Sequence, residues 1–342
     1  MGNILFICGS LNQTTQMHAV AGNLMREHQC YFTPYYGDGI EDLFARMGLL
    51  NFTVLGGRHK RETMEYLASQ NLPLDPRGES RSYDLVVTCS DLLVPKNVRN
   101  KRLILVQEGI TEPESLMFHL VKWLKLPRYL ANTSTNGLSD AYDIFCVASK
   151  GYADLFVRKG VKEHKIAVTG IPNFDNLKTA LKNDFPIRGH VLAATSPLRE
   201  TFRFDNRKAF LQKCSAIAGG RTLVFKLHPL ENVKRAMREI EKYAPSALVF
   251  AYGDIKPMIA NADVVITQQS TSTFIALALG KEVYTNLKIE ELKRLMPIQN
   301  DGASAAQIAR ICERILHTPL EVLLAKRKLA QPRLKRERAD VF

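Results

Sequence analysis

The stretches 225-FKLHPLEN-232 and 261-NADVVITQQSTSTFIALALGKEVYTN-286 decide the fold class. Each carries an apolar run of strand length, LVFKLHP and DVVIT, that ends in polar residues. The second run leads through several hydroxyl-bearing residues into an apolar segment of helix length. A hydroxyl-rich turn at a helix start attracts anions, because unpaired backbone N–H groups and the helix dipole point outward there. The sequence therefore predicts strands whose polar ends form an anion site.

Apolar runs of strand length alternate with helix-like stretches on both sides of these sequences. The expected strands cover residues 3–8, 29–35, 49–57, 83–90, 101–109, 142–149, 190–195, 222–229, 247–252, 263–267 and 281–286. The expected helices include residues 14–28, 40–48, 61–70, 114–126, 231–244, 271–280 and 303–317. Most of the strands are apolar throughout, which is typical of a parallel sheet covered by helices on both faces. We therefore expect an α/β protein of the doubly wound, Rossmann-like type.

The alternation restarts after a more polar segment, so we expect two Rossmann-like domains. Residues 1–175 would form the N-terminal domain, residues 176–187 the linker and residues 188–318 the C-terminal domain. Residues 319–342 would add a closing helix and a basic tail. Two such domains facing a central cleft would bring the carboxyl ends of both sheets to one opening, where α/β sheets bind ligands.

Composition and charge limit the classes of function. The chain has 342 residues, of which 46% are hydrophobic and 24% are charged, as in an ordinary globular protein. The formal net charge is +13. Such an excess suits an anionic small molecule, an acidic membrane surface or a nucleic acid, or serves solubility alone. We do not expect nucleic acid as a partner, because no module of interleaved aromatic and basic residues accompanies the charge.

The six cysteines are scattered and form no CxxC pair. This usage indicates a reducing, cytoplasmic setting, and no zinc framework is visible. We expect no signal peptide, because the opening apolar run is short and no basic segment precedes it. No apolar run approaches the roughly 18–20 residues that a membrane-spanning helix needs.

Candidate site residues in the N-terminal half follow two of the expected strands. Gly9 permits a tight turn after the first strand, and Gln13 belongs to the small polar loop that follows. This is not a GxGxxG fingerprint, so an ordinary connecting loop is the alternative. Glu108 ends the strand RLILVQ, where a carboxylate can act as a general base or hold a substrate hydroxyl. Its alternative role is to stabilise the start of the next helix.

The C-terminal half supplies three further loops at expected strand ends. Thr195 and Ser196 offer hydroxyls after HVLAAT, and Arg199 offers a guanidinium suited to phosphate oxygens. Lys226 and His228 alternate at the end of LVFKLHP, where His228 would bind a diphosphate or ribose, or protonate a leaving phosphate. The third loop would hold donor phosphates through Gln269, Ser270, Thr271, Ser272 and Thr273. The alternative roles are a solvated arginine, a structural histidine and a helix cap.

The helix around the single tryptophan, Trp123, interleaves apolar residues with Lys122, Lys125 and Arg128. It would present an apolar and basic surface to a lipid-linked acceptor. The alternative is an ordinary amphipathic helix with one face packed on the sheet and the other in water.

Four segments resemble the GT-B superfamily, in particular the CDP-glycerol glycerophosphotransferases and the non-hydrolysing UDP-GlcNAc 2-epimerases. The segments are VTGIPNFDNL (168–177), LAATSPLRE (192–200), FKLHPLEN (225–232) and DVVITQQSTSTFIALALGKEVY (263–284). Two N-terminal segments, GSLNQTTQMHAVAGNLMRE (9–27) and VQEGIT (106–111), are more similar to the epimerases. There the resemblance places a catalytic carboxylate at Glu108, but the epimerase arginine of the first loop is missing.

The resemblance implies a GT-B-like transferase whose C-terminal domain binds the donor and whose N-terminal domain receives the acceptor. The implied partners are a nucleotide-sugar or CDP-polyol donor and a glycan or lipid-linked acceptor, with peripheral contact to an acidic membrane. No metal or other cofactor is expected. The glutamate pair of the epimerases is replaced near Ile275 and Ala276, which disfavours epimerase activity. An epimerase-like enzyme and a nucleotide-binding protein without turnover remain the alternatives, and the oligomeric state is left open.

Overall fold

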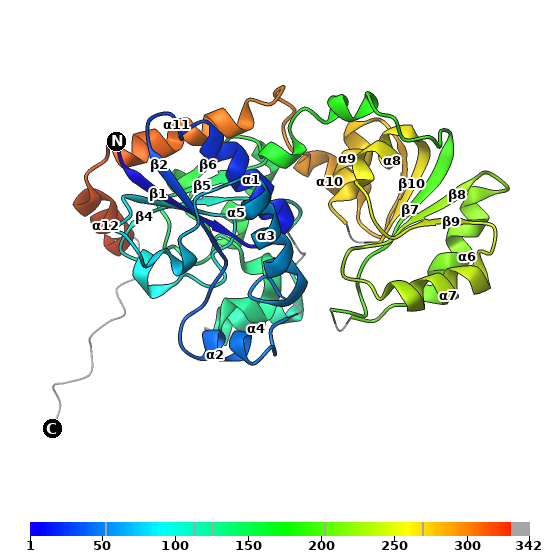
Figure 1. Ribbon diagram of the computed structural model, residues 1–342, viewed down its shortest axis with the longest axis horizontal. Helices are drawn as coiled ribbons and strands as arrows, with labels where there is room; N and C mark the ends of the chain where they lie inside the picture. Colours follow the sequence, from blue (N-terminus) through cyan, green and yellow to red (C-terminus); the bar gives the residue numbers. More distant parts are fainter. Residues whose placement is uncertain (52, 112–113, 125, 202, 269, 330–342) are drawn as a thin grey trace.

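The computed structural model describes residues 1–51, 53–111, 114–124, 126–201, 203–268 and 270–329. Within these ranges the strands form two separate, parallel sheets (Figure 1). The first sheet has the order β2-β1-β3-β4-β5-β6. Its strands are β1 (Asn3–Cys8), β2 (Gln29–Pro34), β3 (Leu85–Thr88), β4 (Arg102–Val106), β5 (Ile144–Val147) and β6 (Ile166–Val168).

The second sheet has the order β11-β10-β7-β8-β9. Its strands are β7 (His190–Ala194), β8 (Leu223–Lys226), β9 (Leu248–Phe250), β10 (Ala262–Thr267) and β11 (Glu282–Tyr284). In both sheets the chain reverses its direction of progress beside the first strand, between β1 and β3 and between β7 and β10. Ligands of open α/β sheets bind at such switch points, outside the carboxyl ends of the strands. The expected α/β class with two doubly wound, Rossmann-like units is confirmed.

Helices connect the parallel strands, as crossover connections require. Around the first sheet these are α1 (Leu11–Gly22), α2 (Ile40–Arg46), α3 (Gly57–Ser69), α4 (Leu116–Leu124) and α5 (Lys150–Lys159). Around the second sheet they are α6 (Arg207–Ala218), α7 (Val233–Tyr243), α8 (Ile255–Asn261) and α9 (Ser272–Ala278). Helix α10 (Ile289–Leu295) follows the last strand and contacts α5. The described chain ends with α11 (Ser304–Leu316) and α12 (Leu320–Leu329). Short 3-10 turns are η1 (Pro76–Gly78), η2 (Lys96–Val98), η3 (Arg128–Thr135), η4 (Glu163–Lys165), η5 (Pro172–Phe174) and η6 (Leu177–Leu181).

Strand β1 illustrates why the apolar runs form central strands. Every side chain from Ile4 to Cys8 is buried, because helices cover both faces of the sheet. Phe6 stacks on Phe32 of the neighbouring strand β2 with ring centroids 5.3 Å apart. An alternating strand would place polar side chains in this core, so the continuous apolar run is required.

Polar side chains set where several helices begin. Ser10 caps α1 by accepting a hydrogen bond from the backbone N–H of Gln13, at 3.3 Å. Asn206 and Asn232 cap α6 and α7 in the same way. Each cap satisfies a backbone N–H that has no partner within the helix, and each directly follows a loop at the carboxyl edge of a sheet.

One hydrophobic core continues from the first sheet to the near face of the second. Phe174 of η5 and Tyr152 of α5 both pack edge-on against Phe274 of α9, with centroid distances of 6.4 and 6.2 Å. The far face of the second sheet has its own core beneath α6 and α7. The two units are therefore packed against each other through apolar side chains.

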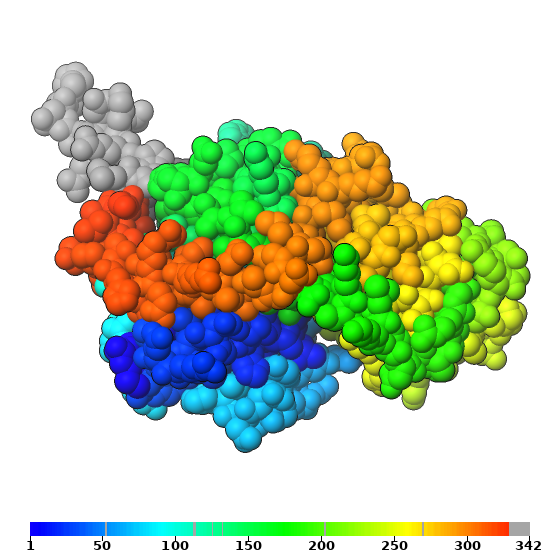
Figure 2. Space-filling view, turned by 90° about the horizontal axis from the view of Figure 1, so that it is seen from above, coloured from blue at the N-terminus to red at the C-terminus, as the bar shows by residue number. Residues whose placement is uncertain are grey.

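Helix α11 returns from the second unit to the first sheet. It packs against α1, β3 and β4, and Figure 2 shows its orange surface lying across the blue N-terminal segment. Its buried residues Ile308, Cys312 and Ile315 recur at helical spacing and form the contact face. Residues 304–316 fall within the range that we expected for the C-terminal domain, but they complete the covering of the first sheet.

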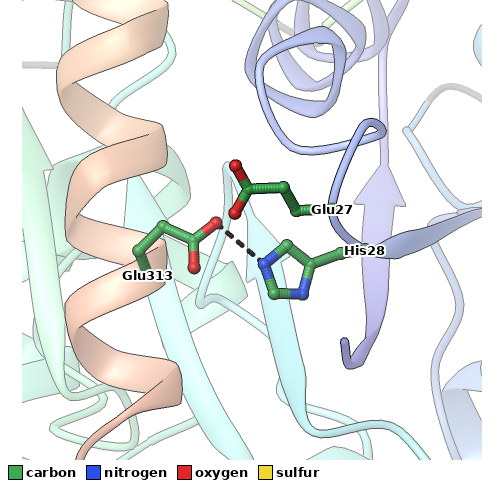
Figure 3. A group of neighbouring side chains, drawn as sticks. All are labelled: Glu27, His28 and Glu313. Carbon is green, nitrogen blue, oxygen red and sulfur yellow. Dashed lines mark hydrogen bonds and ion pairs between the residues drawn. The ribbon is translucent and has the colours of Figure 1, made fainter.

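A histidine holds this returning helix. His28 lies between α1 and β2, and its Nε2 donates to a Glu313 carboxylate oxygen at 2.8 Å (Figure 3). The backbone N–H of Gly2 donates to its Nδ1 at 3.1 Å, so the ring proton resides on Nε2. Glu27 lies nearby, and these are the only three described side chains whose arrangement suits a metal ion. Both ring nitrogens are engaged, so we assign the group to holding α11 in place.

Two sequence-based expectations are corrected. Residues 49–51 and 53–56 form turns and bends instead of a strand, and Phe52 lies outside the described residues. Gly57 has a positive φ of 56°, and a side chain there would overlap the backbone of Asn51, so the backbone turns sharply instead of extending. Helix α3 consequently begins at Gly57, four residues before the expected start, and includes Arg58 and His59.

Candidate active site

The carboxyl edges of the two sheets meet at one place, which we call the junction. Gly109 follows β4 and lies against the turn before α9, since a Cβ atom on Gly109 would be 2.9 Å from Cγ2 of Thr271. Arg58 of α3 donates from Nη1 to the carbonyl of Pro229 in the loop after β8. The carboxyl edges of both sheets therefore face each other, as expected for two Rossmann-like units.

Glu108 is held at the first edge by neutral hydrogen-bond donors. Ser10 Oγ donates to its Oε1 at 2.9 Å, and Gln13 Nε2 donates to its Oε2 at 2.6 Å. Gly9 leaves room for this arrangement, because a Cβ atom there would overlap Oε1 of Gln13. Gly9, Gln13 and Glu108 were predicted separately, and the structure brings them together. The half-buried carboxylate is oriented but has no cation paired with it among the described residues.

His228 lies at the second edge in a neutral form. The backbone N–H of Leu230 donates to its Nδ1 at 3.1 Å, which leaves the ring proton on Nε2. Burial, followed by the positive charges of His59, Lys226 and Arg58, lowers its pKa to about 4. At neutral pH His228 is thus a hydrogen-bond donor through Nε2–H. Protonating a leaving phosphate would require a bound anion to raise its pKa first.

The sequence analysis missed Arg58 and His59, which α3 brings to the junction. Burial lowers the pKa of His59, while the carboxylates of Glu62 and Glu108 act in the opposite direction. His59 is therefore close enough to sense Glu108 on its own sheet and His228 on the other. Gly56-Gly57 was the available signal, because paired glycines immediately before a helical pattern often mark a sharp turn into a helix.

A buried carboxylate, Glu231, fixes the loop that carries His228. It accepts hydrogen bonds from the Thr195 hydroxyl, from the His228 backbone N–H at 2.8 Å and from the Arg207 guanidinium. Thr195 was predicted as a ligand group, but its hydroxyl already joins β7 to this loop. Ser196 is buried beside it at the end of β7.

Two predicted phosphate ligands are engaged elsewhere. Arg199 forms a bidentate ion pair with Glu239, with both N–O distances 2.7 Å, and also pairs with Asp205 at 3.3 Å. Its guanidinium is thus neutralised, so the geometry does not support a phosphate role. Lys226 is buried and its Nζ donates to the carbonyls of Leu227 and Ala251, at 2.8 and 3.3 Å. Burial lowers its pKa, and the amino group ties neighbouring strand ends together.

The turn before α9 presents a small cluster of hydroxyls. Ser272 Oγ donates to Ser270 Oγ at 2.7 Å, and the Ser272 backbone N–H donates to the same oxygen at 3.2 Å. Thr273 is fully buried and bonds Thr267, so it serves the core. Thr271 precedes the helix without a side-chain cap bond and lies against Gly109. Gln269 lies outside the described residues. Since α9 has only seven residues, the hydroxyls of this turn, more than its dipole, are the groups available to an anion.

The fold resembles those of several nucleotide-dependent enzymes. A substituted form of the wall teichoic acid polymerase TagF soaked with CDPG has a TM-score of 0.53 and 12% identity, over 92% of this chain and 89% of that one. UDP-GlcNAc 2-epimerase from Neisseria meningitidis, bound to UDP-GlcNAc, has a TM-score of 0.57 and 12% identity, over 91% and 100%. The S. aureus MnaA–UDP complex has a TM-score of 0.57 and 14% identity, over 93% and 90%.

These likenesses confirm the resemblance in fold to the GT-B type that the sequence motifs indicated. A scan against protein-family models gave no match, and neither did a comparison with curated protein sequences. All six cysteines are buried free thiols. Among the helices described, none is both long and apolar enough to cross a membrane.

Proposed function

We propose that the protein transfers a glycosyl or polyol-phosphate unit from a nucleotide-diphosphate donor to a hydroxyl acceptor at the junction. The observation that carries this proposal is the placement of Glu108 opposite the loop of His228 and the hydroxyls of Ser270 and Ser272. A carboxylate on one edge and uncharged hydrogen-bond donors on the other suit an acceptor hydroxyl facing a diphosphate. The similar folds whose structures contain UDP, UDP-GlcNAc or CDPG support a donor of this class.

The donor would bind to the second sheet. His228 Nε2–H and the Ser270 hydroxyl, whose oxygen already accepts from Ser272, would donate hydrogen bonds to its phosphate and ribose oxygens, and Ser196 lies on the same edge. Arg58 and His59 would approach from the first sheet and stabilise the charge on the departing nucleotide. No metal or other cofactor is required in this scheme, because donors from both sheets share that charge.

The acceptor would react on the side of the first sheet. Its hydroxyl would give a proton to Glu108 while its oxygen bonds to the transferred carbon or phosphorus atom. The bond to the nucleotide phosphate oxygen breaks at the same centre, and that oxygen leaves with the electron pair. Glu108 then returns its proton to solvent, so that each turnover consumes one donor and one acceptor.

Helix α4 supports an acceptor attached to a lipid. On one face of the helix Phe118 and Val121 are buried. On the other, Leu116 and Trp123 are 85% and 80% exposed. A helix that is apolar on both faces normally packs on two sides, and Trp, Leu and Lys together favour a lipid–water interface. The helix follows Glu108 by eight residues, so an interfacial α4 would hold the first edge near membrane-bound acceptors.

Donor binding is the direct test of the proposed reaction. CDP-, UDP- and GDP-linked donors would be screened for a rise in melting temperature and then for turnover with and without acceptor. We expect one donor class to raise the melting temperature. For His228→Ala, we expect about tenfold more donor to be needed for the same rise. His164→Ala, a substitution far along the chain on η4, is the matched control. If no donor raises the melting temperature at millimolar concentration, the proposal fails.

The same assay separates transfer from the alternatives. Interconversion of the donor sugar without acceptor would indicate an epimerase, and binding without turnover would indicate a nucleotide-binding protein. The buried apolar side chains of Ile275 and Ala276 on α9 weigh against the epimerase, because its carboxylate pair has no equivalent there.

Trp123 provides an internal probe for the lipid surface, because it is the only tryptophan of the chain. We expect its fluorescence to shift to shorter wavelength with vesicles containing phosphatidylglycerol, as the ring leaves water. Leu116→Ser together with Leu120→Ser should weaken vesicle binding, while Leu181→Ser, on an exposed part of η6, should not. An unchanged emission spectrum at saturating lipid would refute the membrane contact.

A further inference from the structure

A basic cavity lies between α6 and α7, on the face of the second unit that has its own core. It has a volume of about 390 Å³ and is lined by Arg207, Lys208, Arg235, Arg238, Lys242 and Tyr243, together with Glu239. Figure 1 shows both helices at the end of the molecule farthest from the first sheet. Pockets of this volume accommodate small organic ligands.

The cavity has more positive charge than its own carboxylate can balance. Five cationic side chains line the cavity beside one glutamate, and both oxygens of Glu239 are already bound by Arg199. Two of the five, Arg207 and Arg235, pair with carboxylates outside the lining: Asp205, Glu231 and Glu200. Among the residues that the structure describes, Lys208, Arg238 and Lys242 form no ion pair. Their positive charges are therefore uncompensated by the protein.

The placement of these charges opposes the stability of the helices that carry them. Arg238 and Lys242 stand four residues apart on α7, where like charges repel, although Lys242 is in the last turn, where the helix dipole favours a cation. Lys208 stands in the first turn of α6, at the positive end of the helix dipole. A bound anion would relieve both unfavourable interactions.

Arg207 adds a buried donor at the base of the cavity. The residue is 6% exposed, and its Nη1 has no hydrogen-bond partner among the described residues. Its Nε lies 3.3 Å from a carboxylate oxygen of Asp205. Its Nη2 is bound to Glu231. A buried guanidinium with an unused Nη1 donor is the kind of group that a phosphate oxygen satisfies well.

We propose that this cavity binds a phosphorylated small molecule, at a site separate from the junction. Recognition would come from phosphate contacts, because Lys208 and Lys242 already lie over the Tyr243 ring, at 5.9 and 5.4 Å from its centroid. That ring is consequently a poor platform for stacking a nucleobase. The proposal does not depend on the transferase function.

The cavity is connected to the junction through a short chain of contacts. Arg207 lines the cavity and pairs with Glu231, and Glu231 accepts the backbone N–H of His228. An anion that draws Arg207 toward the cavity would alter the charge around Glu231 and thus the loop of His228. The ligand would therefore influence donor binding by a coupling between two sites.

The test uses the full chain and inorganic pyrophosphate, with binding measured by isothermal titration calorimetry. We expect saturable binding that weakens about tenfold when Arg238→Gln and Lys242→Gln are combined. The matched control combines Lys213→Gln with Lys234→Gln, which removes the same charge from exposed positions of the same two helices outside the cavity. The control should bind pyrophosphate within about twofold of the unaltered protein.

Two further measurements keep the proposal decidable. His228→Ala should bind pyrophosphate as the parent does, whereas the cavity variant binds it more weakly. Without ligand, the cavity variant should unfold at a temperature no lower than that of the parent. Equal losses in the cavity and control variants would overturn the proposal, as would loss of binding only in His228→Ala. Cavity-dependent binding to vesicles with phosphatidylglycerol, but not to pyrophosphate, would identify a lipid headgroup instead and overturn the small-molecule assignment.

Discussion

Glu108 and Glu231 are two carboxylates at facing sheet edges, and they are held in different ways. Glu108 is half-buried and accepts hydrogen bonds only from neutral groups, chiefly Ser10 and Gln13. Glu231 is 5% exposed and is neutralised by Arg207 while it binds the Thr195 hydroxyl and the His228 backbone. An oriented carboxylate without a cation retains its negative charge for chemistry, whereas a neutralised and buried one serves to fix a loop.

The strongest test of this contrast is Glu108→Gln. The substitution removes the charge and keeps the shape, so we expect turnover to fall about a hundredfold to ten-thousandfold. The melting temperature should change little, because no ion pair is lost. The measurement is donor turnover with acceptor, beside a thermal melt. Turnover within threefold of the parent would remove Glu108 from the reaction.

Glu231→Ala should show the opposite pattern. It leaves the buried Arg207 without its closest partner, and breaking such a pair costs about 3–5 kcal/mol of the free energy of unfolding. Urea denaturation measures this cost. Combining it with Arg207→Met should recover part of the loss, since the uncompensated charge is then removed. If Glu231→Ala alone is as stable as the parent, the hydrogen bonds to Glu231 do not hold the loop of His228.

Acid should lower the free energy of unfolding by protonating His228. Its pKa in the folded protein is about 4, below the ordinary value of 6.5, so the unfolded chain takes up a proton first as the pH falls. The contribution of His228 to the free energy of unfolding is therefore fully present above pH 6.5. It is lost between pH 6.5 and 4, by up to about 3 kcal/mol. His228→Gln should flatten that part of the stability curve relative to the parent. If the free energy of unfolding of both proteins depends on pH in the same way, the lowered pKa of His228 is contradicted.

The smallest effect is expected for the contact that links the edges. Arg58→Ala removes the hydrogen bond to Pro229, which should cost about 1 kcal/mol and raise the donor KM several-fold. Arg61→Ala is the control, because Arg61 lies on the same helix and pairs only loosely with Glu65, at 3.8 Å. Equal kinetics for the two variants would mean that Arg58 does not help to align the edges.

The sequence was sufficient for every strand except β6 (Ile166–Val168) and for the positions of their ends, although it also predicted a strand at 49–57 that does not form. Continuous apolar runs such as β1 identify strands buried on both faces, and the loops after them necessarily reach the carboxyl edges. Gly9, Gln13 and Glu108 could be selected for this reason. Their convergence could not, because it depends on the order of strands in the sheet, which residue spacing does not encode.

Charged residues were the least predictable part. Arg199 had the right chemistry for phosphate, but its partner Glu239 is 40 residues away and meets it only after α6 and α7 pack together. Arg58 and His59 were missed because residues 49–57 have the composition of a strand, and only the backbone geometry at Gly57 shows a turn. Local composition thus located the edges, while long-range contacts decided which side chains remain available there.

The return of α11 to the first sheet has a consequence for synthesis on the ribosome. Residues 304–316 cover α1, β3 and β4, so the first unit lacks part of its apolar covering until after the whole second unit has been translated. The second unit is an insertion within the first, and it can complete its own folding earlier although it comes later in the chain. We therefore expect nascent chains that stop before α11 to expose apolar surface on the first unit and to depend on chaperones.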